Sequence, residues 1–456
     1  MQPREVKSAD DARRIVRERG LSHVKIGVHD VDGILRGKYL HVDKLSSALD
    51  SGMGFCDVVL GWDSNDQLYD NVTYTGWHTA YPDAPVRILP ETCRDLPGEA
   101  GGLFFLGEFS EKAEEVCPRG ALRRVLARAE KMGFSVRCGF EYEFFVFAET
   151  PHSIREKGFR NLKPISPGFF GYSVLRNSVF AEWYRELLEF CEAMDFGLEG
   201  LHTETGAGVL EAALRVAPAL DSADKAALFK TFVKVLAQRR DWMATFMAKW
   251  SKDWPGCGGH IHVSLWRDDK GQGAFHDPNA PHGMSETMRA FVAGQQALMP
   301  EVLAMVAPTV NSFRRLIPGY WAPTSATWGV ENRTTALRVI PGSEKSTRVE
   351  YRVAAADGNP YLALAAAVGS GLWGIERQLK LEEPVQGNSY DKTHPPHLDL
   401  PRTLMEAAGR LKASKPARAL FGDAFVEHYA ATREWEEREF RKCITDWELE
   451  RYFEII

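Results

Sequence analysis

Residues 139–147, with the sequence Gly-Phe-Glu-Tyr-Glu-Phe-Phe-Val-Phe, decide the fold of this chain. Apolar and polar residues alternate through them, which predicts a β-strand with one apolar face and one polar face. Glu141 and Glu143 would share the polar face, roughly 6 to 7 Å apart along the strand. Two carboxylates held this close repel each other, so the pair needs a cation, a proton or an arginine between them.

The same alternation recurs in two later stretches, residues 258–265 and residues 348–353. The predicted polar faces of these strands carry His260, His262, Ser264, Arg348, Glu350 and Arg352. A single pattern of this kind usually marks a solvated strand face. Three such strands predict one sheet with an apolar side in the core and a functional, concave polar side.

The composition is that of an ordinary globular protein, and 456 residues are enough for two domains. A net charge of -6 gives no sign of a nucleic-acid surface. The seven cysteines show no Cys-x-x-Cys spacing, which argues against a zinc ribbon or a disulfide framework. The charged N-terminus is unlike a signal peptide, and the longest apolar run, residues 361–375, is short for a membrane span. We therefore expect a cytoplasmic protein with no membrane partner.

The order of the predicted elements divides the chain in two. Residues 9–20 predict a helix, and residues 23–30 and 34–40 predict a hairpin around Asp32-Gly33. Short apolar pieces separated by Gly, Pro and Asp follow as far as residue 117. A helix is predicted to begin at Pro118. We expect an N-terminal domain of residues 1–112 and a second domain of residues 113–456.

The second part contains further helical patterns at residues 118–132, 179–195 and 223–241, with a loop predicted at residues 150–171. Asn359-Pro360 resembles the start of a helix, so the apolar run after it is predicted to be a buried helix.

A carboxylate-rich set in the second part is suited to hard divalent cations such as Mg²⁺ or Mn²⁺. Its members are Glu141, Glu143, Glu204, Glu211, His260 and Glu350. A lone strand histidine is more often an ordinary satisfied polar group, but His260 shares its face with the other candidates. His262 and Ser264 are better suited to hydrogen bonds in the next shell or with a nucleotide.

A basic cluster follows between residues 314 and 352. It consists of Arg314, Arg315, Arg333, Arg338, Lys345, Arg348 and Arg352. Such a run is usually a solvated face, but arginines beside metal-binding carboxylates are what phosphoryl transfer requires. No Walker A or protein-kinase signature is present, so any phosphate site must be of another kind.

These motifs resemble the glutamine synthetase family, from about residue 20 to the C-terminus. They are Gly-x-Glu-x-Glu-Phe at 139–144, Glu-Thr-Gly-Ala-Gly-Val-Leu-Glu at 204–211, residues 256–264, Asn-Ser-Phe-Arg-Arg-Leu-Ile-Pro-Gly-Tyr at 311–320, Asn332-Arg333 and residues 348–352. The resemblance implies an α+β fold with a small N-terminal β-grasp domain and a large catalytic domain. The catalytic domain would hold two metals on a curved antiparallel sheet flanked by helices.

The resemblance also implies roles. One metal would be bound by Glu143, Glu204 and Glu211, and the other by Glu141, His260 and Glu350. ATP would contact Glu199, His262, Ser264, Arg338, Lys345 and Arg348. L-Glutamate would contact Gly256, Arg315, Arg333 and Arg352, of which Arg333 and Arg352 would also be catalytic. The family forms rings, commonly homododecamers, in which each active site includes a neighbour's small domain.

The implied reaction transfers the γ-phosphate of ATP to the side-chain carboxylate of glutamate. An amine then displaces phosphate from γ-glutamyl phosphate and leaves an amide.

Three departures from the ammonia-using members surround the nucleophile or the glutamate. Trp321 stands where those members have an acidic residue, Asp57-Val58-Val59-Leu60 replaces Asp-Gly-Ser-Ser, and Pro255 replaces an Asn. The chain is more similar to the γ-glutamylpolyamine and γ-glutamylmonoamine synthetase branch, including residues 323–329. We therefore expect an amine ligase, with Trp321 contacting the amine.

Two alternatives remain at this stage. One is a glutamine synthetase that uses ammonia with another acid, such as Asp57. The other is a non-catalytic relative, which the complete set of metal and phosphate residues disfavours. Tyr390 lies as far beyond Arg352 as the adenylylated tyrosine of bacterial members lies beyond its matching arginine, but we expect an ordinary loop tyrosine.

Overall fold

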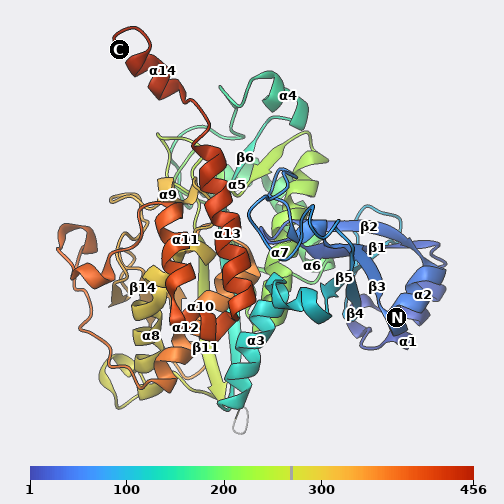
Figure 1. The fold of residues 1–456 in the computed structure, drawn as a ribbon, viewed down its shortest axis with the longest axis horizontal. Coiled ribbons are helices and arrows are strands. Elements are labelled where there is room, and N and C mark those ends of the chain that lie inside the picture. Colours follow the sequence, from blue (N-terminus) through green and yellow to red (C-terminus); the bar gives the residue numbers. More distant parts are fainter. Residues whose placement is uncertain (268–270) are drawn as a thin grey trace.

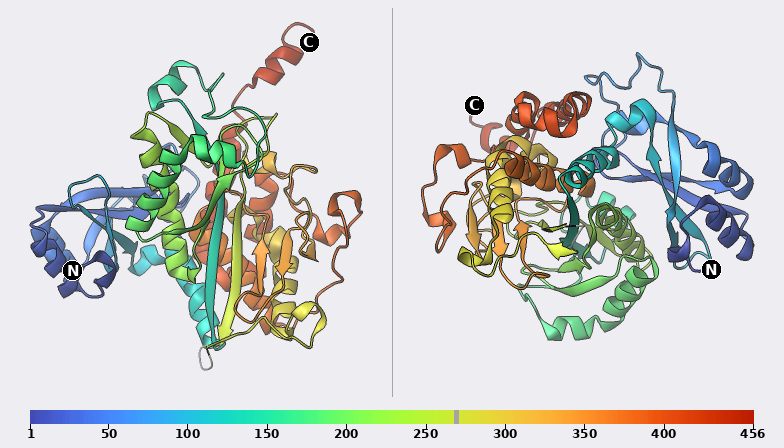
Figure 2. Two further views of the ribbon diagram at one scale, coloured as in Figure 1. Left: turned by 180° about the vertical axis from the view of Figure 1, so that it is seen from behind. Right: turned by 90° about the horizontal axis from the view of Figure 1, so that it is seen from below.

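Two β-sheets, one in each part of the chain, organise the computed structural model, which describes residues 1–267 and 271–456 (Figure 1). The smaller sheet lies to one side of the larger, helix-rich part, and the views in Figure 2 show the same arrangement. No helix in these two ranges is both long and apolar enough to cross a membrane.

The N-terminal sheet has five strands in the order β2-β1-β5-β4-β3. Its strands are β1 (His23–His29), β2 (Leu35–His41), β3 (Met53–Cys56), β4 (Asp83–Asp95) and β5 (Leu103–Phe109). β1 and β5 run parallel, and the other neighbours are antiparallel. The predicted hairpin is present, because Asp30 N donates to Ile34 O across the Asp32-Gly33 turn.

Two helices, α1 (Ala9–Glu18) and α2 (Val42–Ser51), belong to this part. The predicted helix at residues 9–20 corresponds to α1, whose N-cap Ser8 accepts a hydrogen bond from Asp11 N. The strand-rich interpretation of residues 42–117 missed α2. Its buried residues, Leu45 and Ala48, lie three positions apart, the spacing of a helix face, although the surrounding sequence is rich in turn-forming residues.

The larger sheet contains the three strands predicted from alternating residues. Its main path runs in the order β13-β14-β15-β11-β6-β8-β7. Those strands are β6 (Phe134–Phe147), β7 (Leu198–Thr203), β8 (Val209–Leu214), β11 (Gly259–Arg267), β13 (Trp328–Val330), β14 (Leu337–Ile340) and β15 (Arg348–Tyr351). Short strands β9 (Ala217–Pro218), β10 (Met243–Thr245) and β12 (Gln272–Gly273) pair at the sides.

The pairs on this path are antiparallel except β13 with β14, which run parallel, so the curled sheet is mixed at one edge only (Figure 2). β15, β11 and β6 are consecutive neighbours, which confirms the prediction that their polar residues share one sheet.

Helices cover the apolar face of this sheet. The apolar set predicted on β6 is buried: Val136, Cys138, Phe140, Tyr142, Phe144 and Val146. Against it pack α3 (Pro118–Lys131) and α7 (Ala219–Gln238), while α10 (Pro360–Glu376) packs against α3, α7 and α8 (Glu286–Val302). As predicted, α10 is a buried helix, and the Asn359 side chain caps it by accepting from Tyr361 N.

The remaining helices lie around this core. They are α4 (Pro151–Glu156), α5 (Val174–Val179), α6 (Ala181–Ala193), α9 (Ser312–Arg315), α11 (Leu404–Ala413), α12 (Lys415–Phe421), α13 (Asp423–Phe440) and α14 (Asp446–Tyr452). The loop predicted at residues 150–171 therefore contains one short helix. Single 3₁₀ turns include η2 (Asp57–Leu60) and η6 (Ser389–Asp391).

The two parts contact each other through buried polar groups. Arg119 at the start of α3 bonds to Glu108 on β5 and to Asp224 on α7. The first sheet ends at Phe109 and α3 begins at Pro118, so the boundary predicted between residues 112 and 113 falls in the connection. Division into domains at that position remains a proposal.

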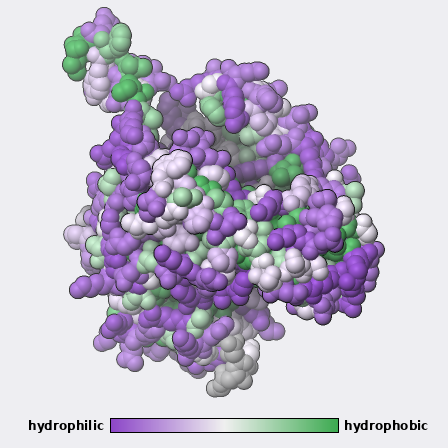
Figure 3. Space-filling view, turned by 45° about the vertical axis from the view of Figure 1, so that its right-hand side comes forward, coloured by the Kyte–Doolittle hydropathy of each residue, from purple (hydrophilic) through white to green (hydrophobic). Residues whose placement is uncertain are grey.

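The C-terminal segment projects from the body (Figure 1), and apolar residues gather on it (Figure 3). Trp447, Phe453, Ile455 and Ile456 are all largely exposed.

Candidate active site

The polar face of the larger sheet brings functional groups together across neighbouring strands. His260 on β11 lies opposite Glu141 on β6, and Glu143 on β6 lies opposite Glu211 on β8. His262 lies opposite Glu350 on β15. Since directly opposed residues place their Cβ atoms about 5 Å apart, the register alone concentrates carboxylates and imidazoles in one band.

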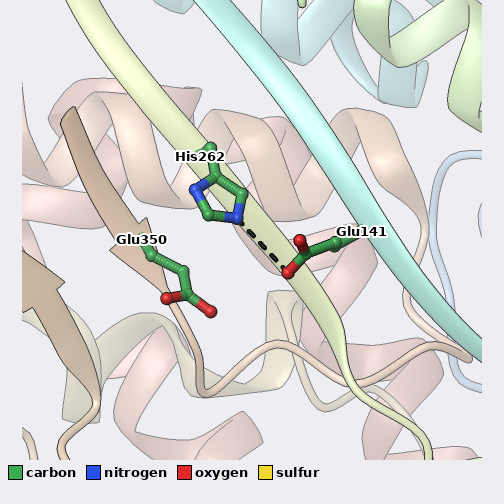
Figure 4. A group of neighbouring side chains, drawn as sticks. All are labelled: Glu141, His262 and Glu350. Atoms are coloured by element: carbon green, nitrogen blue, oxygen red, sulfur yellow. Dashed lines mark hydrogen bonds and ion pairs between the residues drawn. The ribbon is translucent and has the colours of Figure 1, made fainter. Parts of the chain in front are cut away.

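The first cluster consists of Glu141, His262 and Glu350, whose potential ligand atoms lie within 4.8 Å of one another (Figure 4). His262 Nε2 is 3.3 Å from Glu141 Oε2. His260 Nδ1 lies 3.5 Å from both Glu141 Oε2 and Glu350 Oε1. Glu141, His260 and Glu350, predicted as one metal set, are therefore adjacent, and His262 lies beside them.

The hydrogen bonds of His262 assign its tautomer. Arg348 Nε donates to His262 Nδ1 at 3.2 Å, so Nδ1 is the acceptor. The proton of the neutral ring then lies on Nε2, which faces Glu141. This arrangement makes His262 a donor toward Glu141 and links Arg348 to the carboxylate cluster.

The second cluster consists of His202, Glu204 and Glu211. His202 Nε2 is 3.4 Å from Glu204 Oε1 and 3.8 Å from Glu211 Oε1, and its ring stacks on Tyr172 at 4.4 Å. Sequence reasoning missed His202. The available signal was its position two residues before Glu204, which places both on one face of an extended segment.

The carboxylates of this band differ in how well neighbouring groups balance their charges. Burial, followed by the charges of Glu143 and Glu141, raises the pKa of Glu211 to about 10. Burial acts against the charge of Glu350 too, but the charges of Arg352, His260 and His262 together outweigh it and lower the pKa of Glu350 to about 2. Burial also opposes the charge of Glu141, but His260 and His262 lower its pKa. Oxygen-rich clusters with one or two imidazoles fit Mg²⁺ or Mn²⁺, and a dication would relieve the repulsion at Glu211.

Two buried arginines lie beside the carboxylates. Arg352 Nη1 donates to Glu350 Oε1, while Arg315 donates to the carbonyl oxygens of Val353 and Arg352 at 3.1 and 3.2 Å. Arg352 Nε is buried and has no hydrogen-bond partner among the described residues. A buried guanidinium nitrogen without an acceptor is suited to an anionic ligand.

A cavity of about 280 Å³ opens onto these groups. Predicted site residues that line it are Glu141, Glu143, Glu204, Glu211, His260, Gly256, Arg315, Arg333, Arg352 and Trp321. Residues not predicted for a role that also line it are Tyr172, Thr205, Val209 and Tyr320, together with Pro255. The cavity therefore brings together the predicted metal and glutamate residues, apart from Glu350, which contacts His260 and Arg352 beside it.

A second wall of the cavity differs in chemistry from the one that carries the carboxylates, because it is aromatic. Trp321 is 59% exposed and follows Gly319 and Tyr320 in a turn, with a positive φ of 59°. A tryptophan in this left-handed conformation is uncommon, so the surrounding turn has to hold it. Lys249 Nζ lies 4.3 Å from the centre of the Tyr320 ring.

The residues predicted to contact ATP are spread over the sheet outside this cavity. Arg338 Nη1 is 3.1 Å from Glu350 Oε2, and Arg348 contacts His262, so both adjoin the first cluster. Ser264 accepts from Trp266 Nε1. Glu199 lies at an irregularity between β7 and β8, and Lys345 lies in a turn before β15; both are exposed. No side-chain hydrogen bond or ion pair among the described residues joins these last two to the clusters.

Asp57 does not line the cavity. It is buried in η2 of the N-terminal part, where Thr75 Oγ1 donates to its Oδ1 at 2.7 Å, and burial raises its pKa. Tyr390 in η6 has a buried hydroxyl without a hydrogen-bond partner among the described residues. Such a covered hydroxyl gives no support to modification at Tyr390.

Comparison with known proteins decides the family. The family model described as "Glutamine synthetase, catalytic domain" matches residues 115–452. The chain belongs to the glutamine synthetase family. Its members are ligases that use ATP and divalent metals, and the cavity with its carboxylate clusters is the corresponding candidate site.

Relatives in this family differ in their named substrates. Type-1 glutamine synthetase 2 of Dictyostelium discoideum is 46% identical over 95% of this chain and 84% of that protein. Glutamate–isopropylamine ligase of Pseudomonas sp. is 34% identical over 97% of each chain. Gamma-glutamylethanolamide synthetase GlnA4 of Streptomyces coelicolor is 35% identical over 98% of this chain and 95% of that protein.

The solved structure named GmaS/ADP complex superposes with a TM-score of 0.84, at 26% identity, over 97% of this chain and 99% of that one. The predicted α+β architecture is confirmed. Family membership leaves open whether ammonia or an amine is the nucleophile, because the relatives include both kinds of ligase by name.

Proposed function

We propose that this protein is an ATP-dependent ligase that joins the side-chain carboxylate of L-glutamate to an organic amine, a monoamine or a polyamine. The product is a γ-glutamyl amide. The observation that carries this proposal is the composition of the cavity wall around Trp321. Among the described residues that line the cavity, every acidic side chain belongs to the proposed metal-ligand sets, and the remaining wall is aromatic, apolar or basic apart from the hydroxyl of Thr205.

An ammonium pocket has to desolvate a small cation and then accept its proton, which requires an ionised carboxylate near the acyl carbon. Trp321 supplies no base. Its indole can instead cover the alkyl part of an amine, or lie against a second ammonium group as a cation–π partner, worth roughly 0.5 to 2 kcal/mol. This wall therefore favours nucleophiles larger than ammonia.

The carboxylate clusters would bind two divalent cations, which would neutralise charge on the phosphates of ATP. The ligand sets proposed from the sequence are Glu143, Glu204 and Glu211 for one cation and Glu141, His260 and Glu350 for the other. His202 is an additional candidate ligand for the cation proposed at Glu204 and Glu211. Ser264, Glu199, His262, Arg338, Lys345 and Arg348 are proposed to contact the nucleotide.

In the proposed reaction Arg315, Arg333 and Arg352, with the backbone at Gly256, orient glutamate. Its side-chain oxygen attacks the γ-phosphorus of ATP, and ADP leaves. Arg352 would stabilise charge that develops on the transferred phosphoryl group. The amine nitrogen then attacks the acyl carbon, phosphate departs with the bonding electrons, and the released phosphate takes up the proton that the nitrogen loses.

Ligation of ammonia is the second candidate. The observation that favours it is the 46% identical relative named as a glutamine synthetase. Asp57, the acid of the 57–60 segment, would then have to reach the site from a neighbouring subunit. A non-catalytic role is disfavoured because competent metal and phosphate residues meet on one face of the sheet.

We also propose a ring assembly, a homododecamer, in which the N-terminal part of one subunit completes the site of the next. The exposed apolar side chains of the projecting C-terminal segment are suited to burial between subunits. The seven unpaired cysteines suit a cytoplasmic location.

The test is magnesium-dependent release of ADP in the presence of L-glutamate and one nucleophile at a time: ammonium, methylamine, ethanolamine or putrescine. The proposal predicts that at least one amine supports faster release than ammonium at equal concentration. Faster release with ammonium than with every amine would favour glutamine synthesis, and no release with any nucleophile would favour a non-catalytic relative.

A further inference from the structure

A second cavity of about 730 Å³ lies on the reverse side of the larger sheet, and we call it the rear cavity. The argument uses Asp32, Lys230, Lys234, Phe246, Asp357 and Glu436 from its lining. Lys230 Nζ lies 5.6 Å from the centre of the Tyr142 ring. Because Tyr142 points away from Glu141 and Glu143 on β6, the rear cavity is separated from the metal clusters by the sheet itself.

The basic groups of the rear cavity come from one helix. Lys230 and Lys234 are one turn apart on α7, and their ammonium groups lie 5.9 and 5.6 Å from the centre of the Phe246 ring. Lys230 donates to Gly358 O at 2.7 Å. Neither lysine forms an ion pair with a carboxylate among the residues that the structure describes.

The surroundings of Lys230 and Lys234 disfavour the charged form of both side chains. Burial, reinforced by the neighbouring charge of Lys234, lowers the pKa of Lys230 to about 7. Lys234 lines the cavity, and desolvation of its ammonium group by the surrounding protein lowers its pKa. An anionic group in the cavity would stabilise both ammonium ions.

The acidic groups come from other elements. Asp357 Oδ2 accepts from Thr309 and Ser312 at 2.7 and 2.8 Å, but its Oδ1 is buried and has no partner in the described ranges. The carboxylate of Glu436 on α13 makes no hydrogen bond within those ranges, and burial raises its pKa, with Asp357 among the nearby charges that add to the effect. A buried carboxylate oxygen without a donor is destabilising, so a donor on a bound ligand would stabilise it.

The rear cavity thus contains charged groups of both signs that make no ion pair with each other among the described residues. Direct pairing does occur there where distance permits, since Arg433 Nη2 lies 2.7 Å from Asp32 Oδ1. A ligand that carries one charge only would satisfy one set and leave the other unpaired. A ligand with an ammonium group and a carboxylate satisfies both, and the Phe246 ring can cover the carbon atoms between them.

We propose that the rear cavity is a binding site for a small zwitterion, an amino acid in the broad sense. Its carboxylate is bound by Lys230 and Lys234, and its ammonium group is bound by Asp357 and Glu436. The proposal concerns a site separate from the proposed ligase chemistry and does not depend on the identity of the nucleophile.

Calorimetric titration of the intact assembled protein, without ATP, tests the proposal. The probes are L-alanine, with adjacent charges, and 6-aminohexanoate, with separated charges; acetate and tetramethylammonium are single-charge controls. We expect at least one zwitterion to bind at least tenfold more tightly than either control. Lys234→Met and Glu436→Gln should each weaken that binding by at least tenfold.

Two variants serve as controls. Lys225→Met changes a lysine of α7 that is paired with Asp221 and does not line the rear cavity, so binding should persist. Arg352→Ala alters the candidate active-site cavity. Zwitterion binding that persists in this variant therefore does not take place in that cavity. Thermal melts followed by circular dichroism identify any variant that fails to fold. If either Lys234→Met or Glu436→Gln does not fold, the other one tests the proposal.

The proposal is overturned if neither zwitterion binds, if the controls bind equally well, or if binding is unchanged in both cavity variants. It is also overturned if an experimental structure of the assembly shows a neighbouring subunit filling the cavity.

Discussion

The active-site cavity has two walls of different chemistry. The sheet wall carries carboxylates, imidazoles and arginines, joined by cross-strand contacts such as that between His260 and Glu350. The wall at Trp321 is aromatic and exposed, and its backbone is held in a left-handed turn. The sheet wall therefore carries the groups that we propose for phosphoryl transfer, whereas the Trp321 wall is where the choice of nucleophile is expected to be made.

Removing a carboxylate from the sheet wall is expected to have the largest effect. Glu143→Ala and Glu350→Ala should each lower kcat/KM by at least about a hundredfold with every nucleophile, because each deletes a candidate metal ligand. The assembly should persist, since neither change opens the apolar core. Steady-state rates at matched metal concentration and size-exclusion chromatography check both points.

Glu182→Ala, on the exposed surface of α6, is the matched control and should leave the rate unchanged. Full activity in either cluster variant would refute the metal assignment.

Arg352→Ala should have the second-largest effect, a loss of about a hundredfold to a thousandfold in kcat. ATP should still bind, because Arg352 is proposed to act on glutamate and on the moving phosphoryl group. Nucleotide binding by calorimetry, measured beside kcat/KM for glutamate, separates the two roles. Arg314→Ala, an exposed neighbour in the same basic cluster, should have little effect, and an unchanged kcat/KM for glutamate in Arg352→Ala would count against the assignment.

His202→Ala should have an intermediate effect and sharpen the description of the sheet wall. His202 lies beside Glu204 and Glu211, so its loss should weaken the apparent metal affinity by about 10 to 100-fold. Activity titrated against Mn²⁺ should recover substantially at saturating metal. A purely structural role through stacking on Tyr172 predicts instead that His202→Phe retains the metal dependence of the wild type.

Trp321→Glu should have the smallest effect on total rate and the most informative one on selectivity. A carboxylate at this position should shift the ratio of kcat/KM for ammonium to that for an amine by at least tenfold toward ammonium, about 1.4 kcal/mol. Trp321→Phe should retain the preference of the wild type. An unchanged ratio in Trp321→Glu would show that the aromatic wall does not choose the nucleophile.

The sheet wall was predictable because period-two alternation determines which side chains share a face. Residues 139–147, 258–265 and 348–353 each revealed their polar face, and antiparallel pairing then brought His260 opposite Glu141. The helix α10 was equally predictable from its Asn359-Pro360 start.

What was missed depended on contacts between distant elements. His202 owes its significance to pairing between β7 and β8 and to a loop that brings Tyr172 onto its ring. The rear cavity joins a hairpin turn, α7 and α13, which no local pattern connects. Any role for Asp57 in catalysis depends on a neighbouring subunit, so neither the sequence pattern nor the single chain places it.

A direct competition tests the central claim most directly. The wild-type protein would be incubated with ATP, magnesium, L-glutamate and equal concentrations of ¹⁵N-ammonium and one amine, and the two amides would be quantified by mass spectrometry. Their initial ratio reports the ratio of kcat/KM for the two nucleophiles. The account predicts at least a tenfold excess of the γ-glutamyl amide for at least one of methylamine, ethanolamine and putrescine. Predominance of ¹⁵N-glutamine against all three would contradict it.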